Sequence, residues 1–380
     1  MSAPAWLRVP LSSRSALETV TTTLGERERR RRQATAIARA ASSTNHIQPT
    51  DQDGCGDSTV DDRVKRYNAV DAFKSVHRLK NRYGDIYPYD RTRVELARPL
   101  EPFRAIECPT DWYVNATLLR EPDIAIPGVE RRWWIAAQAA VPETSSLEPP
   151  NLIVQLTPLV ENGRRKADPY FPAQPGQTAR IDSSESELRP WFIRLDDKQE
   201  RDGVRTSRLS LATSVDSLDD DSNTKKLTHV EYLGWGDHGV PDSSSHLASF
   251  VQSMLDLNVR LARDPSKPPP IVVGCSAGVG RTGTFITIAS LLPLVRDTSL
   301  VDKFQGLDAI ETQTGGVATQ LGGPKLDLVS LARQHGVDPF DFVALTIDGL
   351  REQRVSMVER PSQVRFCYEA LLAAWEASHD

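Results

Sequence analysis

The chain has 380 residues, of which 39% are hydrophobic, so it can form a sizeable core in one large domain with appendages or in two ordinary domains. Its formal net charge of -5 provides no overall basic field, which argues against nucleic acid as a general partner. The longest apolar stretch, residues 285–295, is interrupted by Thr287, Ser290 and Pro293 and is too short to cross a bilayer. No membrane span is therefore predicted.

The cysteines give an indication of the compartment. Cys55, Cys108, Cys275 and Cys367 form no CxxC pair and have no histidine at a zinc-binding spacing, so neither a metal nor another cofactor is expected. The pattern favours a reduced intracellular protein, although an extracellular disulfide pair stays open by count alone. The N-terminus has no charged segment followed by an apolar core, which argues against secretion. We expect a cytoplasmic protein, with the nucleus as the alternative.

Residues 1–61 are predicted to be a flexible tail. They are rich in Ser, Thr, Ala, Arg and Gly, with one polar helix expected near 26–41, so little of their surface can be buried. The first 17 residues contain Arg8 and Arg14 but no acid, as in a mitochondrial transit peptide, yet a disordered tail is the favoured interpretation. The basic run at 27–32 is compatible with a nuclear import signal, with a contact for an acidic partner or with a solvated face.

From residue 62 to residue 380 the pattern is that of a folded domain. Segments with β-branched or aromatic residues between Pro or Gly turns predict strands at 133–137, 152–156, 191–195, 205–211, 227–233 and 270–273. Helical periodicity predicts helices at 245–263, 282–295, 341–353 and 363–377. Strands followed by helices indicate an α/β fold with a mixed sheet flanked by helices. Two polar stretches, near 212–224 and 297–336, are expected to be surface insertions.

The segment VVGCSAGVGRTG at 272–283 combines an apolar strand, a glycine-containing loop and the start of a helix. Gly278 and Gly280 permit backbone conformations that turn successive N–H groups inward, which makes an anion site at the positive end of the helix. Arg281 adds a planar charged fork that can bind two phosphate oxygens. The same field favours the thiolate form of Cys275, which is the attacking species.

Two other interpretations of this segment are weaker. A cysteine after an apolar strand is ordinary core in most proteins, but the two glycines and Arg281 favour a functional role for Cys275. A nucleotide-binding loop is disfavoured, because no Lys-Ser/Thr pair ends the loop.

The nine residues CSAGVGRTG resemble the CxxxxxR signature of the protein tyrosine phosphatases, and the chain is similar to the non-receptor members of that family. The resemblance extends from about residue 64 to residue 374, apart from the inserted stretches. It implies a single phosphatase domain with a highly twisted mixed central sheet, and tyrosine-phosphorylated proteins as substrates. It also implies that phosphate is bound by the loop residues Ser276, Ala277, Gly278, Val279, Gly280 and Thr282.

The sequence KNRYGDIYPYD at 80–90 resembles the substrate-recognition loop of the family. The resemblance implies that Tyr83 stacks on the phosphotyrosine ring and that Asp85 holds the peptide backbone, with Ile86 also among the substrate-binding residues. A deep pocket with an aromatic wall would admit phosphotyrosine, whereas phosphoserine falls short of the cradle. Farther along, Glu161 matches the acid that orients the clamp arginine, and Lys166 matches a lysine near the acid loop.

The loss of a tyrosine oxygen is easier when that oxygen is protonated, so a mobile carboxylic acid is expected. The sequence WGDHGVP at 235–241 resembles the acid loop of the family, and Asp237 falls on the position of the general acid. Gly236 replaces the usual proline, which broadens the open ensemble of the loop. Near the C-terminus, Glu359 stands where the family has the glutamine that positions the hydrolytic water, and Gln363 is the alternative for that role. Gly274 replaces the histidine before the cysteine, so reduced activity is expected.

These residues predict a protein-tyrosine phosphatase that needs no metal. Cys275 attacks phosphorus, Arg281 holds the phosphate oxygens, Asp237 protonates the leaving oxygen, and water hydrolyses the cysteinyl-phosphate. The alternative is a phosphotyrosine-binding pseudophosphatase with little turnover, but binding alone would need neither the cysteine nor the acid. A phosphoinositide phosphatase is a third option, which Ala277 and Val279 disfavour because that group generally carries lysines inside the loop.

Overall fold

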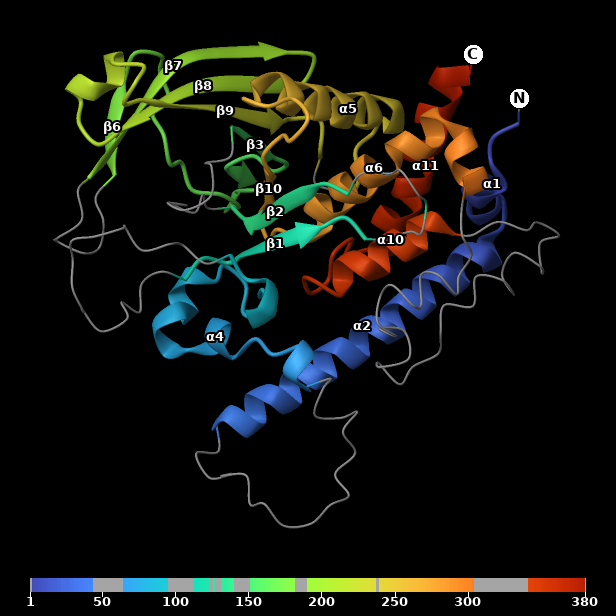
Figure 1. Ribbon diagram of the computed structural model, residues 1–380. Coiled ribbons are helices and arrows are strands. Elements are labelled where there is room, and N and C mark those ends of the chain that lie inside the picture. Colours follow the sequence, from blue (N-terminus) through green and yellow to red (C-terminus); the bar gives the residue numbers. More distant parts are fainter. Residues whose placement is uncertain are drawn as a thin grey trace.

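The computed structural model describes residues 2–43, 64–94, 113–122, 126, 131–139, 151–181, 190–236, 239–303 and 341–379. Eight strands of this part form one twisted mixed sheet that helices flank (Figure 1). In spatial order they are β1 (Ala116–Arg120), β2 (Trp133–Gln138), β10 (Ile271–Cys275), β3 (Leu152–Gln155), β9 (Lys225–Tyr232), β8 (Val204–Ala212), β7 (Trp191–Arg201) and β6 (Thr178–Ile181). The arrangement confirms the predicted α/β class with a mixed sheet flanked by helices.

Strand β10 lies inside the sheet and runs parallel to both of its neighbours. Val273 is opposite Ala136 of β2 and Val154 of β3, and Cys275 is opposite Gln138 at the end of β2. The apolar residues 271–273 are buried, as expected for a parallel strand that is covered on both faces. The carboxyl end of β10 is therefore a fixed point from which the next loop starts.

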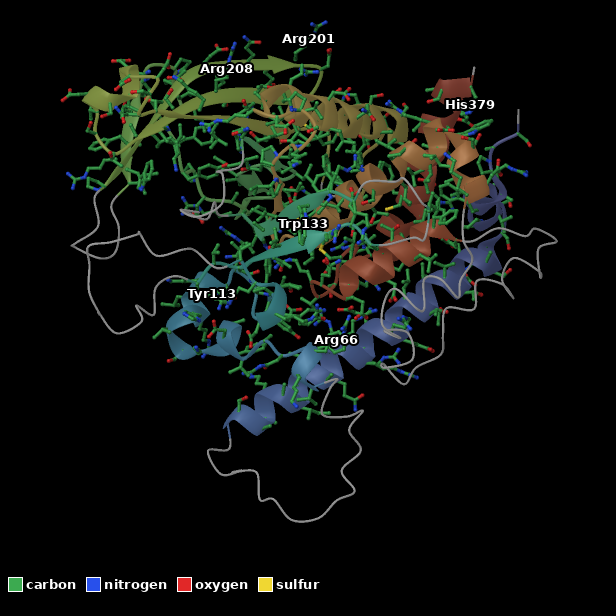
Figure 2. All side chains as sticks on the ribbon, viewed as in Figure 1. Arg66, Tyr113, Trp133, Arg201, Arg208 and His379 are labelled. Carbon is green, nitrogen blue, oxygen red and sulfur yellow. The ribbon has the colours of Figure 1, made fainter. Side chains whose placement is uncertain are left out.

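Strands β6, β7, β8 and β9 form the antiparallel side of the sheet. Strands β7 and β8 form a long hairpin whose turn contains Asp202 and Gly203, both at positive φ. Arg201 and Arg208 point outward from this hairpin (Figure 2). The insertion predicted near 212–224 contains the 3-10 helix η3 (Asp216–Asp219), which is anchored by the buried side chain of Leu218.

The large helices of the second half are α5 (Ser244–Leu261), α6 (Gly280–Arg296), α10 (Phe342–Arg351) and α11 (Pro361–His379). Helix α6 follows β10 directly, packs on β2 and β10, and is in contact with α5, α10 and α11. It is buried on all sides, because apolar residues and small hydroxyl residues surround its axis. The helix that follows Cys275 is thus the central helix of the domain.

The sequence located most of these elements correctly. The six predicted strands coincide with β2, β3, β7, β8, β9 and β10, and the four predicted helices with α5, α6, α10 and α11, to within a few residues except at the longer β7. The edge strands β1 and β6, the short pair β4 (Val160–Glu161) and β5 (Arg164–Arg165), and helix α4 (Val70–Phe73) were not predicted. Three further 3-10 helices, η1 (Ser75–Lys80), η2 (Asp90–Thr92) and η4 (Thr298–Lys303), were also not predicted. Most of the second predicted insertion, residues 304–336, lies outside the described residues.

The structure corrects the prediction of a flexible N-terminal tail for residues 2–43. These residues form α1 (Ala5–Ser12) and the 30-residue helix α2 (Arg14–Ser43), both of which contact the C-terminal helices (Figure 1). Trp6 of α1 packs edge-on against Phe342 of α10, with 5.3 Å between ring centroids. The rest of the predicted tail, residues 44–61, lies outside the described residues.

The buried face of α2 explains why composition alone was misleading. Buried side chains recur every three or four residues along one face of this helix, at Ala16, Val20, Leu24, Arg27, Glu28, Arg31, Ala34, Thr35 and Ala38. The stripe has the 3.6-residue period of a packed helix, but small residues and arginines make it weakly hydrophobic. Asp348 of α10 and Glu352, which follows that helix, balance the two buried arginines. In the described part of the chain, we find no helix that is both long and apolar enough to span a membrane.

Candidate active site

Cys275 is the last residue of β10, and its side chain is only 5% exposed. Its Sγ accepts a hydrogen bond from the backbone N–H of Gly278 at 3.3 Å, and α6 begins two residues later. Gly278 has a φ of 71°, and a Cβ at this position would overlap the carbonyl group of Ala137. The tight turn from strand to helix therefore requires glycine and places the sulfur at the positive end of α6.

Arg281 lies in the first turn of α6, and the rest of the domain fixes its guanidinium. Its Nη1 donates to the carbonyl oxygen of Leu156 at 3.1 Å and forms an ion pair with Glu161. Glu161 Oε1 also accepts a hydrogen bond from Thr157 Oγ1 at 3.0 Å. The guanidinium carbon is 5.9 Å from the centre of the Trp235 ring. Glu161 thus holds the guanidinium of Arg281 against the rest of the domain.

Residues 80–90, the recognition segment, contact the loop that follows Cys275 through a pair of hydroxyl groups. The hydroxyl oxygen of Tyr83 is 2.8 Å from Ser276 Oγ, which donates its own proton to the carbonyl oxygen of Lys166 at 2.9 Å. Tyr83 is therefore the donor to Ser276, because a serine has one hydroxyl proton. The ring of Tyr83 and the segment that contains Lys166 therefore both lie beside the loop, although they are distant from it in sequence. Asp85 is exposed at the outer edge of the segment, whereas Ile86 is buried in the core.

Gln138 connects the recognition segment to the sheet. It is the last residue of β2, opposite Cys275, and its Oε1 accepts a hydrogen bond from the backbone N–H of Arg82 at 3.0 Å. Its Nε2 donates to the carbonyl oxygen of Lys80 at 2.5 Å. Gln138 was not predicted from the sequence to be functional. A signal was present, because an amide at the end of an apolar strand must find polar partners when it is buried.

Arg354 is a second residue that was missed, and it is fully buried. Its Nε donates to the carbonyl oxygen of Gly278 at 2.9 Å, and its Nη2 donates to that of Ala277 at 3.2 Å and to Asn115 Oδ1 at 2.8 Å. Burial lowers the pKa of Arg354 to about 10, against the opposing effects of Tyr113 and Cys275. The carbonyl groups of the loop face this arginine. Because the N–H of a peptide unit points away from its carbonyl group, the loop N–H groups are directed toward the opposite side, where an anion would bind.

In the acid segment, residues 235–241, the structure describes residues on both sides of the position predicted for the general acid but not that position itself. Asp237 and His238 lie outside the described residues. Before them, Trp235 is buried and donates from its indole Nε1 to the carbonyl oxygen of Gly239 at 3.2 Å, across the two residues. At Gly236, a Cβ would have no heavy atom within 4 Å, so packing does not require the glycine found there.

Gln363 and Glu359 have different surroundings. Gln363 is buried in the first turns of α11, and its Nε2 donates to the carbonyl oxygen of Gly239 at 3.2 Å. A Cβ on Gly280 would lie 3.0 Å from the amide of Gln363, so this side chain is packed between the acid segment and the loop. Glu359 is exposed and has no hydrogen bond or ion pair with any residue that the structure describes. Of the two candidates for positioning water, only Gln363 lies against the loop.

The remaining predicted residues are placed as follows. Thr282 is buried in the first turn of α6, and the side chain of Lys166 is half-buried after β5. Gly274 leaves little room for a side chain, because a Cβ there would lie 3.3 Å from the carbonyl oxygen of Ala137. Among the described residues, no group of three or more His, Cys, Asp or Glu side chains could hold a metal ion.

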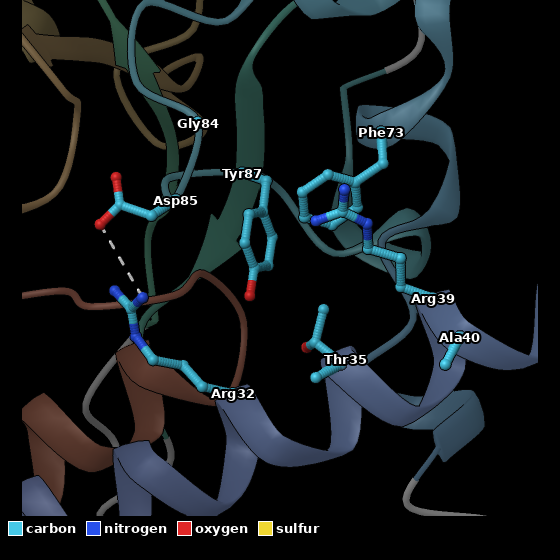
Figure 3. Close-up of a pocket in the computed structure, with 9 residues that line it drawn as sticks. Arg32, Thr35, Arg39, Ala40, Phe73, Gly84, Asp85 and Tyr87 are labelled. Atoms are coloured by element: carbon cyan, nitrogen blue, oxygen red, sulfur yellow. Dashed lines mark ion pairs between the residues drawn. The ribbon is translucent and has the colours of Figure 1, made fainter. Parts of the chain in front are cut away.

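A groove lies between α2 and the recognition segment, with a volume of about 430 Å³ (Figure 3). At one end, Arg32 is 4.0 Å from Asp85, and at the other end the guanidinium of Arg39 lies 4.3 Å above the ring of Phe73. Tyr87 lines the middle of the groove. The N-terminal helix thus forms part of the surface next to the recognition segment.

Comparisons with known proteins agree with the geometry. A family model described as "Protein-tyrosine phosphatase" matches residues 77–321, which is more than half of the chain. The human tyrosine-protein phosphatase non-receptor type 4 is 28% identical over 305 residues, covering 78% of this chain and 25% of that protein. The mouse tyrosine-protein phosphatase non-receptor type 9 is 28% identical over 310 residues, covering 77% of this chain and 41% of that protein.

A receptor-type protein is also similar. The chicken receptor-type tyrosine-protein phosphatase eta is 32% identical over 240 residues, covering 60% of this chain and 14% of that protein. The chain therefore spans less than half the length of each of these relatives.

Proposed function

The chain belongs to the protein-tyrosine phosphatase family, and from this premise we propose that it hydrolyses phosphotyrosine in proteins through a cysteinyl-phosphate intermediate. The observation that carries the proposal is the position of Cys275 just before α6, with the N–H of Gly278 on its sulfur and with Arg281, in the first turn of α6, held by Glu161. A thiolate and a fixed guanidinium at a helix N-terminus form a site for a phosphate dianion.

Substrate binding would use the loop backbone and the aromatic wall. The phosphate oxygens accept hydrogen bonds from the loop N–H groups, whose carbonyl partners face Arg354. The guanidinium of Arg281 adds a bidentate charged contact. Tyr83, fixed through Ser276, lines one side of the approach and favours a flat aromatic ring over a short serine side chain. Asp85 is exposed where the peptide backbone would pass.

The first chemical step forms a sulfur–phosphorus bond and breaks the phosphorus–oxygen bond to tyrosine. The electron pair of that bond leaves with the phenolic oxygen, which Asp237 protonates. In the second step water attacks the cysteinyl-phosphate, Asp237 takes a proton from the water, and the thiolate of Cys275 is released. Gln363 is the side chain best placed to orient this water, because it lies against Gly280 and bonds to the acid segment.

A phosphotyrosine-binding protein with little turnover is the alternative. Its support in the sequence was the departure from the family pattern at Gly236, Gly274 and Glu359. The part that depends on Glu359 is weakened by the exposure of Glu359 and by the buried position of Gln363. The proposed setting is the cytoplasm, because a catalytic thiolate needs a reducing compartment and two of the three relatives described are of the non-receptor type.

Turnover of a phosphotyrosine peptide tests the proposal directly. We expect release of inorganic phosphate from this peptide, much slower release from a matched phosphoserine peptide, and no turnover by Cys275→Ser, since a serine hydroxyl is a far weaker nucleophile. Cys367→Ala is the matched control, because Cys367 is a second buried free cysteine, in α11. Wild-type binding of the phosphopeptide without phosphate release would support the alternative instead.

A further inference from the structure

Helix α2 is attached to α10 by a buried ionic network. Arg27 donates to both carboxylate oxygens of Asp348 at 2.8 and 2.6 Å. Arg31 contacts Asp348 at 2.5 Å and Glu352 at 2.7 Å, and Glu352 also accepts a hydrogen bond from the hydroxyl of Tyr67. Burial alone would raise the pKa of Asp348, but the charges of the two arginines outweigh it and hold that pKa below its ordinary value. These contacts fix the position of α2 along α10.

Glu28 lies between these two arginines in α2 but bonds to a different segment. Its Oε1 accepts a hydrogen bond from the backbone N–H of Ser356 at 2.9 Å and is 3.2 Å from Ser356 Oγ. Its other oxygen is 3.5 Å from Arg31 Nη1. The carboxylate is buried, and so is Ser356. A buried N–H group that loses its acceptor is destabilised, so this contact constrains the backbone at residue 356.

The segment 356–358, which follows α10, has an unfavourable backbone conformation. Ser356 has a φ of 59° and Val358 a φ of 55°, and the left-handed region is disfavoured above all for a β-branched residue. Such a conformation persists only when neighbouring groups hold it. Glu28 holds the first residue, and Arg351 donates to the carbonyl oxygens of Met357 and Val358 at 2.8 and 2.6 Å.

The same segment contacts the loop that carries the nucleophile. The backbone N–H of Val358 donates to the carbonyl oxygen of Val279 at 3.2 Å. A Cβ on Gly283 would overlap the backbone of Val358, so the segment is pressed against the first turn of α6. Arg281 lies in that turn. The conformation of residues 356–358 is therefore coupled to the position of the anion site.

We propose that Glu28 is a positioning residue for the phosphate loop, and that its contact with Ser356 links α2 to the anion site. The inference rests on the proposed function, because it concerns the geometry of the same site. Glu28 acts through Ser356, Val358 and Val279 in that order, and it does not touch the substrate. Without its carboxylate, residues 356–358 relax toward ordinary backbone angles, and the loop loses the contact at Val279.

The test measures oxyanion affinity separately from folding. Glu28→Ala should bind orthovanadate, a phosphate analogue, about tenfold more weakly than wild type at a temperature at which both are folded, because a buried N–H group has lost its partner. Glu28→Gln keeps an acceptor oxygen and should stay within about twofold of wild type. Glu18→Ala is the matched control, since Glu18 is an exposed glutamate on the same helix, paired with Arg14.

A second variant separates positioning from general stability. Ser356→Gly removes the backbone strain at a φ of 59°, because glycine adopts this conformation readily. In a Ser356→Gly background, Glu28→Ala should weaken vanadate binding by about twofold or less, so the two changes are coupled in a double-mutant cycle. An equal loss in both backgrounds would overturn the proposal. So would a lower melting temperature of Glu28→Ala with unchanged vanadate affinity. If wild type binds no vanadate, the proposed function fails, and the positioning role fails with it.

Discussion

Arg354 donates a hydrogen bond from Nε to the carbonyl oxygen of Gly278 at 2.9 Å, from a fully buried position behind the loop. Arg354→Lys keeps the charge but cannot reproduce a planar fork that reaches two carbonyl groups and Asn115 together. We expect kcat/KM for p-nitrophenyl phosphate to fall by at least about tenfold, since the loop N–H groups lose their orientation. Arg365→Lys, at an exposed position in α11, is the control. Unchanged activity of a folded Arg354→Lys protein would contradict this role.

Asp237→Ala should slow the hydrolysis of phosphotyrosine far more than that of p-nitrophenyl phosphate. Tyrosine is a poor leaving group and needs a proton, whereas p-nitrophenolate leaves readily without one. The ratio of kcat values on the two substrates, compared between variant and wild type, is the measurement. Equal losses on both substrates would remove Asp237 from the acid role.

Gln363→Ala should slow the hydrolysis of the phosphoenzyme more than its formation, because the water loses its orienting amide. Rapid-quench kinetics should then show a burst of the phenolic product, followed by a slower steady rate of its release. Glu359→Gln is the matched comparison, and it should leave both phases within about twofold of wild type because Glu359 is exposed. If Glu359→Gln raises the steady rate and Gln363→Ala does not lower it, the two assignments are reversed.

Tyr83 contributes both a hydroxyl group and an aromatic ring to the site, and two variants test the two contributions separately. Tyr83→Phe removes only the hydrogen bond to Ser276 and should cost a few-fold in kcat/KM, in keeping with the loss of one neutral hydrogen bond. Tyr83→Ala removes the wall as well and should narrow the preference for phosphotyrosine over phosphoserine peptides. Selectivity that is the same in wild type and Tyr83→Ala would show that another group sets the pocket depth.

Stability should fall as the pH is lowered below 6.5, and His229 should account for part of the loss. Burial, together with the charge of Arg205, lowers the pKa of this histidine from 6.5 to about 3. The folded state therefore keeps it neutral while the unfolded state takes up a proton, so unfolding is favoured progressively from pH 6.5 toward pH 3. Between pH 7 and pH 5 the contribution is about 2 kcal/mol.

Urea unfolding of wild type and His229→Gln at both pH values checks this sign. The variant should lose less stability than wild type on acidification, even if it is less stable at pH 7. A parallel loss in the two proteins would mean that other groups cause the pH dependence.

The strand, tight turn and helix around Cys275 could be predicted from the sequence because their requirements are local. An apolar strand, two glycines and an arginine six residues after Cys275 define both the turn and the anion site within a dozen residues. The same holds for Tyr83, whose segment matched a known pattern. Arg354 could not be recognised in this way, because its partners lie on segments far away in sequence. For Gln138 the only signal was an amide at the end of an apolar strand, which does not identify its distant partner Arg82.

The N-terminal helix was misjudged for the same reason. Ala16, Val20 and Leu24 alone form a short stripe, and Arg27 and Arg31 continue it only if acids from elsewhere neutralise them. Periodicity gives no information on a partner in α10. Edge strands β1 and β6 were missed because they are short and mixed in character, and their conformation depends on pairing with β2 and β7.

The pairing of α2 with α10 also has a consequence for how the protein is made. Arg27 and Asp348 are 321 residues apart, so at roughly 5 to 20 residues per second the ribosome completes the second partner about 16 to 64 s after the first. During that interval the nascent helix has its basic stripe but none of the acids of α10. A chain whose synthesis stops before residue 341 would contain Cys275 but neither Arg354 nor residues 356–358. Truncated translation products would therefore contain Cys275 without the groups that hold its loop.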